Sequence, residues 1–390
     1  MKIYNFDEIV NRRGTYCVKH DMLNEVFGTE DLLPMWVADM DFKTPDFIVD
    51  AVRERCNHAV FGYTFAPEGY KMAVLNWLQT HYHIETKWKN MHFIPGIVQG
   101  IAFVLQAFTQ PGDKVLVTTP VYPPFLNVPH RSGRIFVSSS LKTVNGRFVI
   151  DYADLEEKAR GCKVMILANP HNPGGTVWTK EELATIADIC QRQHVLVIAD
   201  EIHADLTLPG YEHTSFSTVS DTALHNSITF IAPSKTFNMA GLASSVCYVP
   251  DPDIKKWFFG FLDANELSLG SLFAYIAAEA AFAYGEEWRL QLLAYLQGNI
   301  DITEQYLQEH LPMIKMMRPE ASFLLWLDFR ELGLPHNKLV DLLIHKAKVG
   351  LNSGLDYGTD GEGFMRMNIG TPRANILEAL ERIRQAIKTL

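Results

Sequence analysis

Short apolar runs recur through the middle of the chain without alternating polar and apolar positions. The six runs are Lys114–Thr119, Arg134–Ser138, Lys163–Asn169, Val195–Asp200, Ser227–Pro233 and Ser244–Pro250. A strand that is apolar on both faces must be covered on both faces, as happens in a mostly parallel sheet between helices. The pattern therefore predicts a buried, mostly parallel sheet.

Helical patterns separate several of these runs. The segment Thr179–Gln193 opens with the letters TKEEL, which resemble a capping box, and keeps apolar residues on one face. The segment Ile97–Thr109 is a second amphipathic stretch, and it ends before Pro111 and Gly112. Strands that alternate with helices predict a doubly wound α/β domain.

The last third of the chain has a different pattern, which predicts a smaller α+β domain. Its elements are a long helix Glu286–His310, strands Ala321–Phe329 and Phe364–Ile369, and a terminal helix with an apolar stripe of Ile376, Leu380, Ile383 and Ile387. We expect residues 45–285 to form the large domain. Residues 1–44 and 286–390 are expected to form the small domain together.

Composition narrows the function classes. The chain has 390 residues, 47% of them hydrophobic, which is ordinary for a soluble globular protein with a large buried core. Acidic residues outnumber basic ones by 45 to 35, so nucleic-acid binding is disfavoured. The five cysteines are odd in number and never spaced as C-x-x-C, which argues against a disulfide framework and against a zinc site. We therefore expect no metal.

Targeting signals are also disfavoured by the sequence. Residues 1–13 mix charged and apolar positions and lack the apolar run of a signal peptide. The most apolar stretch, Ser271–Tyr284, contains Glu279 and is too short to span a bilayer. We expect a cytoplasmic protein with no membrane partner.

Polar and aromatic residues follow the predicted strands at one edge of the sheet. Tyr122 follows the first run, Asn172 the third, Asp200 and His203 the fourth, and Lys235 the fifth. In open α/β sheets, ligands bind outside the carboxyl ends of the strands. The sequence therefore predicts that these side chains share one site.

Their chemistry suits pyridoxal 5′-phosphate (PLP). Only a lysine side chain can supply the amine that joins the aldehyde of PLP, and burial keeps that amine neutral. An aspartate such as Asp200 favours the proton on the pyridine nitrogen, and an amide such as Asn172 can hold the phenolic oxygen. The ring of Tyr122 can stack on the cofactor.

A helix start can supply the phosphate site. The letters GIVQG at Gly96–Gly100 open the helix predicted from Ile97, so backbone N–H groups at Val98 and Gln99 can point at a phosphate. These letters are not a G-x-G-x-x-G fingerprint, and no strand is followed by one, which disfavours a dehydrogenase.

Each residue also has an ordinary structural interpretation. A loop lysine is usually a solvated charge, although Lys235 follows an apolar strand and precedes Phe237. Asp200 could cap a turn, the NPGG turn could need Asn172 for its shape alone, and His203 could be a core histidine. The interpretation as a site depends on the shared location of these residues.

A family resemblance covers nearly the whole chain, and four motifs between residues 119 and 242 carry most of it. They are TPVYPPF, NPHNPGG, DEIH and PSKTFNMAGL. With them the chain resembles the fold-type I PLP-dependent enzymes, the class I/II aspartate aminotransferase superfamily. The resemblance implies that Lys235 binds PLP covalently, that Asp200 faces the pyridine nitrogen, that Asn172 binds the phenolic oxygen and that Tyr122 stacks on the ring. It also places His203 beside the cofactor.

Two further segments match the family. FGYTFAPEGY places Tyr63 where the family reaches the phosphate of a neighbouring subunit, which implies a homodimer with shared active sites. FMRMNIGTPR places Arg366 as the clamp for the substrate α-carboxylate, a task that suits a bidentate guanidinium. A surface charge is the ordinary interpretation of Arg366.

The phosphate site departs from the broader family. Ala243 and Ala232 stand where many aminotransferases have an arginine and a serine. We therefore expect the phosphate to depend on the Gly96–Gly100 loop, on Ser234 and on Tyr63.

The N-terminal segment PMWVADMDFKTP is similar to that of the cystathionine β-lyase-like C–S lyases. The resemblance makes this segment a loop over the mouth of the active site, with Trp36 close to the substrate. His203 in DEIH also fits that subgroup. The carboxylates of Asp39 and Asp41 could suggest a metal pair, but two carboxylates alone are poor evidence for one.

The resemblance implies β-elimination from cystathionine or another cysteine S-conjugate. Lys235 would remove the α-proton, a thiolate would leave the β-carbon, and the products would be a thiol, pyruvate and ammonia. Two alternatives stay open at this point. An aminotransferase would use the same residues, and a PLP-binding regulatory protein would keep the fold.

Overall fold

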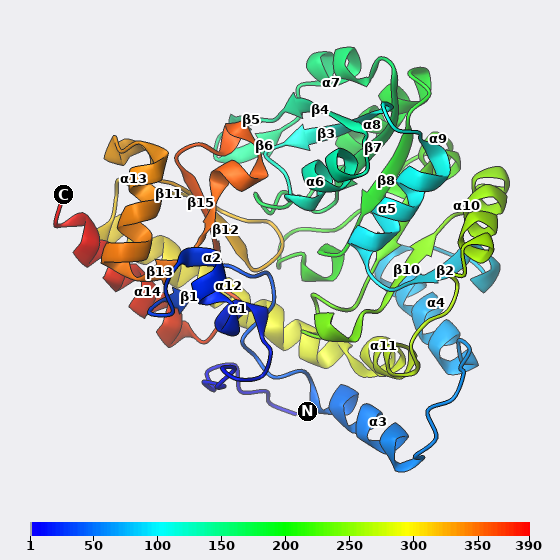
Figure 1. Ribbon diagram of the computed structural model, residues 1–390, viewed down its shortest axis with the longest axis horizontal. Coiled ribbons are helices and arrows are strands. Elements are labelled where there is room, and N and C mark those ends of the chain that lie inside the picture. The colour runs from blue at the N-terminus through cyan, green and yellow to red at the C-terminus, as the bar shows by residue number, and fades with distance from the viewer. Residues whose placement is uncertain (1) are drawn as a thin grey trace.

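The centre of the protein is a twisted sheet, seven-stranded in the computed structural model, which describes residues 2–390 (Figure 1). Its strand order is β2-β10-β9-β8-β7-β3-β4. The strands are β2 (Met91–Ile94), β3 (Lys114–Thr119), β4 (Ile135–Ser140), β7 (Cys162–Ala168), β8 (Leu196–Asp200), β9 (Ser227–Ile231) and β10 (Ser245–Tyr248). Neighbours from β9 to β4 pair in parallel, whereas β10 is antiparallel to both β9 and β2. The prediction of a mostly parallel sheet is confirmed.

Helices cover both faces of this sheet. Two separate hydrophobic clusters occupy the faces, and each includes alternate residues of the same buried strands, such as Val197 and Ile198 on β8. One face carries α5 (Ile97–Phe108), α6 (Pro124–Arg131) and α10 (Pro252–Ala264). The other carries α7 (Tyr152–Ala159), α8 (Lys180–Arg192) and α9 (Asp221–His225). This is the doubly wound arrangement that the strand–helix alternation predicted.

Helix α8 begins as the sequence indicated. The Thr179 hydroxyl accepts a hydrogen bond from the Glu182 N–H, and the Glu182 carboxylate accepts one from the Thr179 N–H, which completes a capping box. Leu183 and Ile186 on its inner face are fully buried against the sheet.

A four-stranded antiparallel sheet forms the C-terminal part of the described chain, in the order β11-β12-β15-β14. Its strands are β11 (Lys315–Met317), β12 (Leu324–Asp328), β14 (Asn352–Ser353) and β15 (Phe364–Asn368). The helices around it are α12 (Glu286–His310), α13 (His336–Asp341), which continues as a π-helical turn at Leu342–Ala347, and α14 (Arg373–Ile387). The predicted long helix, both predicted strands and the terminal helix are therefore confirmed.

The N-terminal segment packs on this C-terminal part (Figure 1). It contains α1 (Val18–Asp21), α2 (Leu23–Phe27) and β1 (Leu33–Pro34), and β1 pairs in parallel with β13 (Val349–Gly350). Phe6 contacts Trp288 on α12, with ring centroids 5.6 Å apart. The domain boundaries stay a prediction, because one hydrophobic cluster runs from Phe6 through helices of both parts to α14.

Several elements were not assigned from the sequence. They include β2, the hairpin of β5 (Lys142–Val144) and β6 (Arg147–Val149), the short strands β1, β11, β13 and β14, and the helices α1, α2, α3 (Asp46–Asn57), α4 (Glu68–Tyr82), α6, α7, α9, α10, α11 (Leu272–Tyr284) and α13. Among residues 2–390, no helix combines the length and hydrophobicity that a membrane crossing needs.

The order of the strands creates a switch point between β3 and β7. The chain leaves β3 for β4 on one side and later enters β7 on the other side of β3. The loops that follow β3 and β7 therefore run apart at the carboxyl edge, which is where ligands bind in such sheets.

The loop after β7 depends on Gly175. Its φ is +69°, and a Cβ there would lie 2.6 Å from the Cβ of Pro319 and 2.8 Å from the carbonyl oxygen of Ala321. The N–H groups of Glu320 and Ala321 also donate to the Gly175 carbonyl. Close packing against the C-terminal part thus fixes the loop that carries Asn172.

We predict that Gly175→Ala lowers the free energy of unfolding by more than Gly161→Ala does. Gly161 has a similar φ of +76° but open space at its Cβ, so alanine there should cost only the left-handed conformation, about 1–2 kcal/mol. Gly175→Ala adds a steric clash with backbone. Urea unfolding of both variants measures the difference, and equal losses would contradict the packing argument.

Candidate active site

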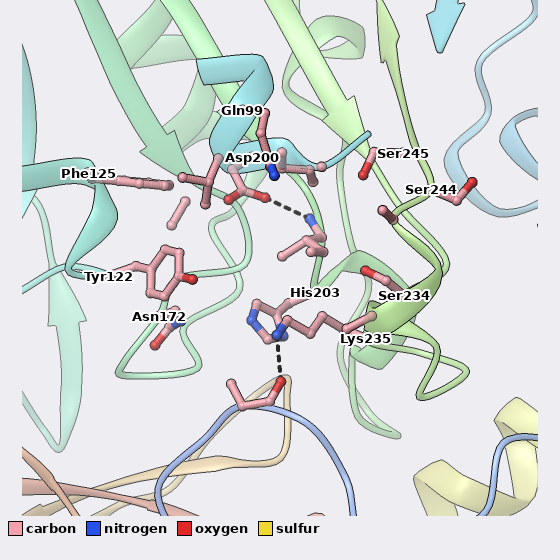
Figure 2. Close-up of a pocket in the computed structure, with 18 of the residues that line it drawn as sticks. Gln99, Tyr122, Phe125, Asn172, Asp200, His203, Ser234, Lys235, Ser244 and Ser245 are labelled. Carbon is pink, nitrogen blue, oxygen red and sulfur yellow. Dashed lines mark hydrogen bonds between the residues drawn. The ribbon is translucent and has the colours of Figure 1, made fainter. Parts of the chain in front are cut away.

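A cavity of about 160 Å³ lies at the carboxyl ends of β7, β8 and β9 (Figure 2). Most of the residues that the sequence assigned to one site line this cavity: Val98, Gln99, Tyr122, Asn172, Asp200, His203, Ser234 and Lys235. The sequence therefore grouped eight residues that line one cavity, and the role of each residue stays a prediction.

Lys235 lies in the loop after β9, and its side chain points into the cavity (Figure 2). Its amino group donates a hydrogen bond to the carbonyl oxygen of Ala38. Burial, followed by the charge of Arg366, lowers the pKa of Lys235 to about 8, while Asp39 and Asp200 act in the opposite direction. A large fraction of this amine is therefore neutral near pH 8, as a nucleophile or base requires.

Asp205 is buried and forms a hydrogen bond to the loop that carries Lys235. Its carboxylate accepts hydrogen bonds from the Trp77 indole at 2.9 Å, the Tyr82 hydroxyl and the Thr236 hydroxyl at 3.2 Å. Thr236 is the residue after Lys235, so this buried carboxylate fixes the backbone beside the amine. Sequence reasoning missed Asp205, although its place just after DEIH was a signal.

Asp200 ends β8 and is buried. Its carboxyl accepts the Ile202 N–H at 3.0 Å. Burial raises the pKa of Asp200 to about 7, against the effects of the Ile202 N–H and of Lys235. A protonated pyridine nitrogen would supply the positive charge that this buried carboxylate lacks. Ile202 also lines the cavity and was not singled out from the sequence.

Arg366 on β15 orients Asn172. The Nη1 of Arg366 donates to the Oδ1 of Asn172 at 3.2 Å, which leaves the Nδ2 of Asn172 free to donate to a ligand. The backbone of this loop is held as well, because the Tyr122 N–H donates to the Asn172 carbonyl at 3.0 Å. Asn172 can therefore hold an oxygen such as the phenolic oxygen of PLP.

The guanidinium of Arg366 is 3% exposed and still has a donor to offer. Its Nη2 donates to the Oδ1 of Asn352 at 2.7 Å and to the Trp36 carbonyl at 2.9 Å. Its Nε is buried and has no hydrogen-bond partner within residues 2–390. A carboxylate would satisfy this donor. Asn352 was missed by sequence reasoning because it lies in a short strand without a motif.

His203 is a neutral polar group at the site. Burial, and then the charges of Lys235 and Arg366, lowers the pKa of His203 to about 3. Its Nδ1 is buried without a partner among the described residues, so it can form a hydrogen bond with a ligand.

The start of α5 provides a phosphate cradle. Gly96 is the N-cap and has no side-chain cap, so the first N–H groups of the helix stay available to an anion. A Cβ at Gly96 would lie 2.4 Å from the Oε1 of Gln99, so a larger residue would intrude here. Ser234 and Ser244 lie opposite, and the Ser244 hydroxyl is buried without a partner within residues 2–390. The sequence identified Ser234 but missed Ser244.

Three predicted residues, Arg366, Tyr63 and Trp36, do not line the cavity with their side chains, and Arg366 is linked to it through its hydrogen bond to Asn172. Tyr63 lies between α3 and α4 and is fully exposed, at 105% of its reference area. The Trp36 indole donates to the Lys19 carbonyl at 3.0 Å and packs on Phe27, so only the Trp36 carbonyl approaches the site. The roles given to Tyr63 and Trp36 stay predictions.

The polar groups of this cavity match those of PLP one by one: an amine for the aldehyde, a carboxyl for the pyridine nitrogen, an amide for the phenolic oxygen and a helix start for the phosphate. Among residues 2–390, no group of three or more histidine, cysteine, aspartate or glutamate side chains could hold a metal ion.

The family model for aminotransferases of class I and II matches residues 31–383. The chain belongs to this family. It is 42% identical over 385 residues to cystathionine beta-lyase PatB of Bacillus subtilis, an alignment that covers 98% of this chain and 100% of the relative. The family resemblance and the α/β fold expected from the sequence are both confirmed.

Solved structures of the family superpose along the whole chain. Cystalysin from Treponema denticola, whose crystals contain PLP, has a TM-score of 0.96 and 32% identity, with 100% of both chains covered. The PLP-bound C–S lyase from Staphylococcus hominis has a TM-score of 0.90 and 32% identity, with 98% of this chain and 99% of that chain covered.

We predict that Asp200→Asn changes the pH dependence of stability in cofactor-free protein. A folded-state pKa near 7, above an unfolded value near 4, gives stability that is present below pH 4 and lost as pH rises through 7. Between pH 5 and 8 this one group should cost the wild type about 3 kcal/mol that the asparagine variant does not lose. Urea unfolding at both pH values measures the difference, and a variant effect of equal size at pH 5 and 8 would contradict it.

Proposed function

We propose that this protein is a PLP-dependent C–S lyase that converts cystathionine or another cysteine S-conjugate, together with one water molecule, to a thiol, pyruvate and ammonia. The observation that carries the proposal is the partly buried Lys235 amine, whose pKa is lowered to about 8 by desolvation and by the charge of Arg366, in one cavity with the buried Asp200. Relatives named cystathionine beta-lyase and C–S lyase that align over nearly the whole chain support it.

PLP, when bound, supplies an electron sink that makes the α-proton of an amino acid acidic. The residues of the chain supply position and proton transfer. Arg366 binds the substrate α-carboxylate through its unpaired Nε, and Asn172 holds the cofactor ring in place. Fixing both partners accounts for much of the rate in such reactions.

Lys235 acts as the general base. Its neutral amine accepts the proton from the α-carbon, and the thiolate then leaves the β-carbon. The low pKa of Lys235 keeps a useful share of the amine neutral at physiological pH. Asp200, as a carboxylate, keeps a proton on the pyridine nitrogen, and its burial excludes water that would weaken that interaction.

We also propose a homodimer that completes the site. The loop between α3 and α4 exposes Val60, Phe61, Tyr63 and Phe65 to solvent in the single chain. Exposed apolar groups of this kind mark interaction surfaces. A second copy would cover them and receive Tyr63 at its phosphate cradle. A cytoplasmic location is proposed as well, since all five cysteines are free.

Supplying cystathionine without any keto acid tests the reaction. We expect repeated turnover that releases pyruvate, and no pyruvate from Lys235→Ala, because no other amine lines the cavity among the described residues. Pyruvate is followed through lactate dehydrogenase. Turnover only after a keto acid is added would replace the lyase with an aminotransferase, which belongs to the same family and uses the same base.

Mixing two inactive variants tests the shared site. Lys235→Ala lacks the base, and Tyr63→Ala is expected to bind PLP weakly. In a hybrid dimer, one of the two sites combines the intact lysine of one chain with the intact tyrosine of the other, and the second site lacks both. We therefore expect activity to return after the two variants are unfolded and refolded together. No return above the separate variants would refute a shared site.

A further inference from the structure

Five ionisable side chains of the N-terminal segment form a cluster: Arg12, Lys19, His20, Asp39 and Asp41. Lys19 is the most unusual of them, because it is 0% exposed. Its amino group donates to the Oδ2 of Asp41 at 2.7 Å. Lysine is almost never fully buried unless it is paired, so this pair calls for an explanation.

Arg12 joins the two carboxylates. Its Nη1 lies 2.8 Å from the Oδ1 of Asp41 and 3.0 Å from the Oδ1 of Asp39, and its Nη2 lies 2.6 Å from the Oδ2 of Asp39. Burial opposes ionisation of Asp41, yet Lys19, His20 and Arg12 together hold the pKa of its carboxyl well below the usual range. The cluster is therefore a charged network with two anions and two cations.

This network holds a segment that touches the site through its backbone. The Ala38 carbonyl accepts the hydrogen bond of Lys235, and the Trp36 carbonyl accepts one from Arg366 at 2.9 Å. Asn368 donates to the Asp39 carbonyl at 2.7 Å from the other side. Ala38 thus directly precedes Asp39, the first of the two aspartates whose side chains form the ion pairs.

Stability alone is a weak explanation for this network. Removing two charges from water is expensive, and well-packed apolar residues often stabilise a protein as much as a buried ion pair does. The better attested use of buried ions is to fix one arrangement of the chain. Here that arrangement brings a carbonyl to a reactive amine.

We propose that Lys19 and Asp41 are positioning residues that hold the Ala38 carbonyl against the amino group of Lys235 whenever this amine is free of cofactor. The proposal rests on the function proposed above, in which Lys235 is the base. Through it, the N-terminal segment helps to set the pH at which the free lysine loses its proton.

The charges around Lys235 fix the direction of the effect. Burial and Arg366 favour the neutral amine, Asp39 and Asp200 favour the ammonium, and His203 is uncharged at neutral pH. The Ala38 carbonyl also favours the ammonium, which is the stronger donor. Loosening the segment removes the carbonyl and moves Asp39 away, so the pKa of Lys235 should fall.

The test uses the full chain with four substitutions: Lys19→Met, Asp41→Asn, their combination, and Lys43→Met as a matched control. Lys43 pairs with Glu8 on the same segment, but both side chains are largely exposed. Two readouts are compared. Hydrogen exchange of the amides at residues 35–41 is measured in protein with PLP, and acetic anhydride labelling of Lys235 is measured against pH after PLP is removed.

We expect the combined variant to exchange at least tenfold faster at residues 35–41 while the amides of β8 stay protected. Its labelling curve for Lys235 should move to lower pH by about one unit. Asp41→Asn leaves the buried Lys19 without an anion, and Lys19→Met leaves Asp41 with Arg12 as its remaining cation. Both single variants should be less stable than the combined variant, which decides the case if they fail to fold. Lys43→Met should match the wild type in both readouts.

Wild-type exchange and labelling in the combined variant would overturn the proposal. So would faster exchange that extends equally to β8, since that indicates general destabilisation. Neither readout requires a thioether substrate or a turnover, so failure of the lyase assay would leave this result interpretable.

Discussion

The placement of one partly buried amine in a cavity between opposing charges is the constraint on which the rest of the structure depends. Lys235 needs burial to lose its proton near neutral pH, and it needs Asp200 nearby without direct pairing to it. A tight ion pair between the two would keep the lysine charged and remove its reactivity. The Lys235 amine donates to the Ala38 carbonyl, and the Asp200 carboxyl accepts from the Ile202 N–H. Each of the two groups therefore keeps a separate role.

Both sheets contribute to this arrangement. Lys235, Asp200 and Asn172 follow strands of the large sheet, whereas Arg366 lies on β15 of the small one. The contact between Arg366 and Asn172 joins them across the site. Behind it, Arg147 binds both Glu182 on α8 and Glu320 before β12. The geometry of the site therefore depends on how the two sheets pack, and one continuous hydrophobic cluster links the helices between them.

Much of this could be predicted from the sequence because the relevant signals are local. Buried parallel strands are continuous apolar runs, and the residues after them must meet at one edge, which placed Tyr122, Asn172, Asp200 and Lys235 together. Strand β2 was not predicted, because its four residues show no distinctive hydrophobic period. The burial of Lys19 and the role of Asp205 also escaped, since both depend on partners more than 20 residues away along the chain. Tyr63 lies on the surface of the single chain, where its side chain is fully exposed.

Arg366 lies beside Asn172, and most of its guanidinium is already engaged by the amide oxygens of Asn172 and Asn352 and by the Trp36 carbonyl. These neutral acceptors leave its positive charge uncompensated. A bound molecule with a free carboxylate brings both the missing charge and an acceptor for Nε. An ester or an amide brings an acceptor without the charge, and a simple amine leaves that donor without a partner at a cost of about 1–3 kcal/mol. With Arg366 in its proposed role, the pocket would distinguish metabolites by the acid group that takes no part in bond cleavage.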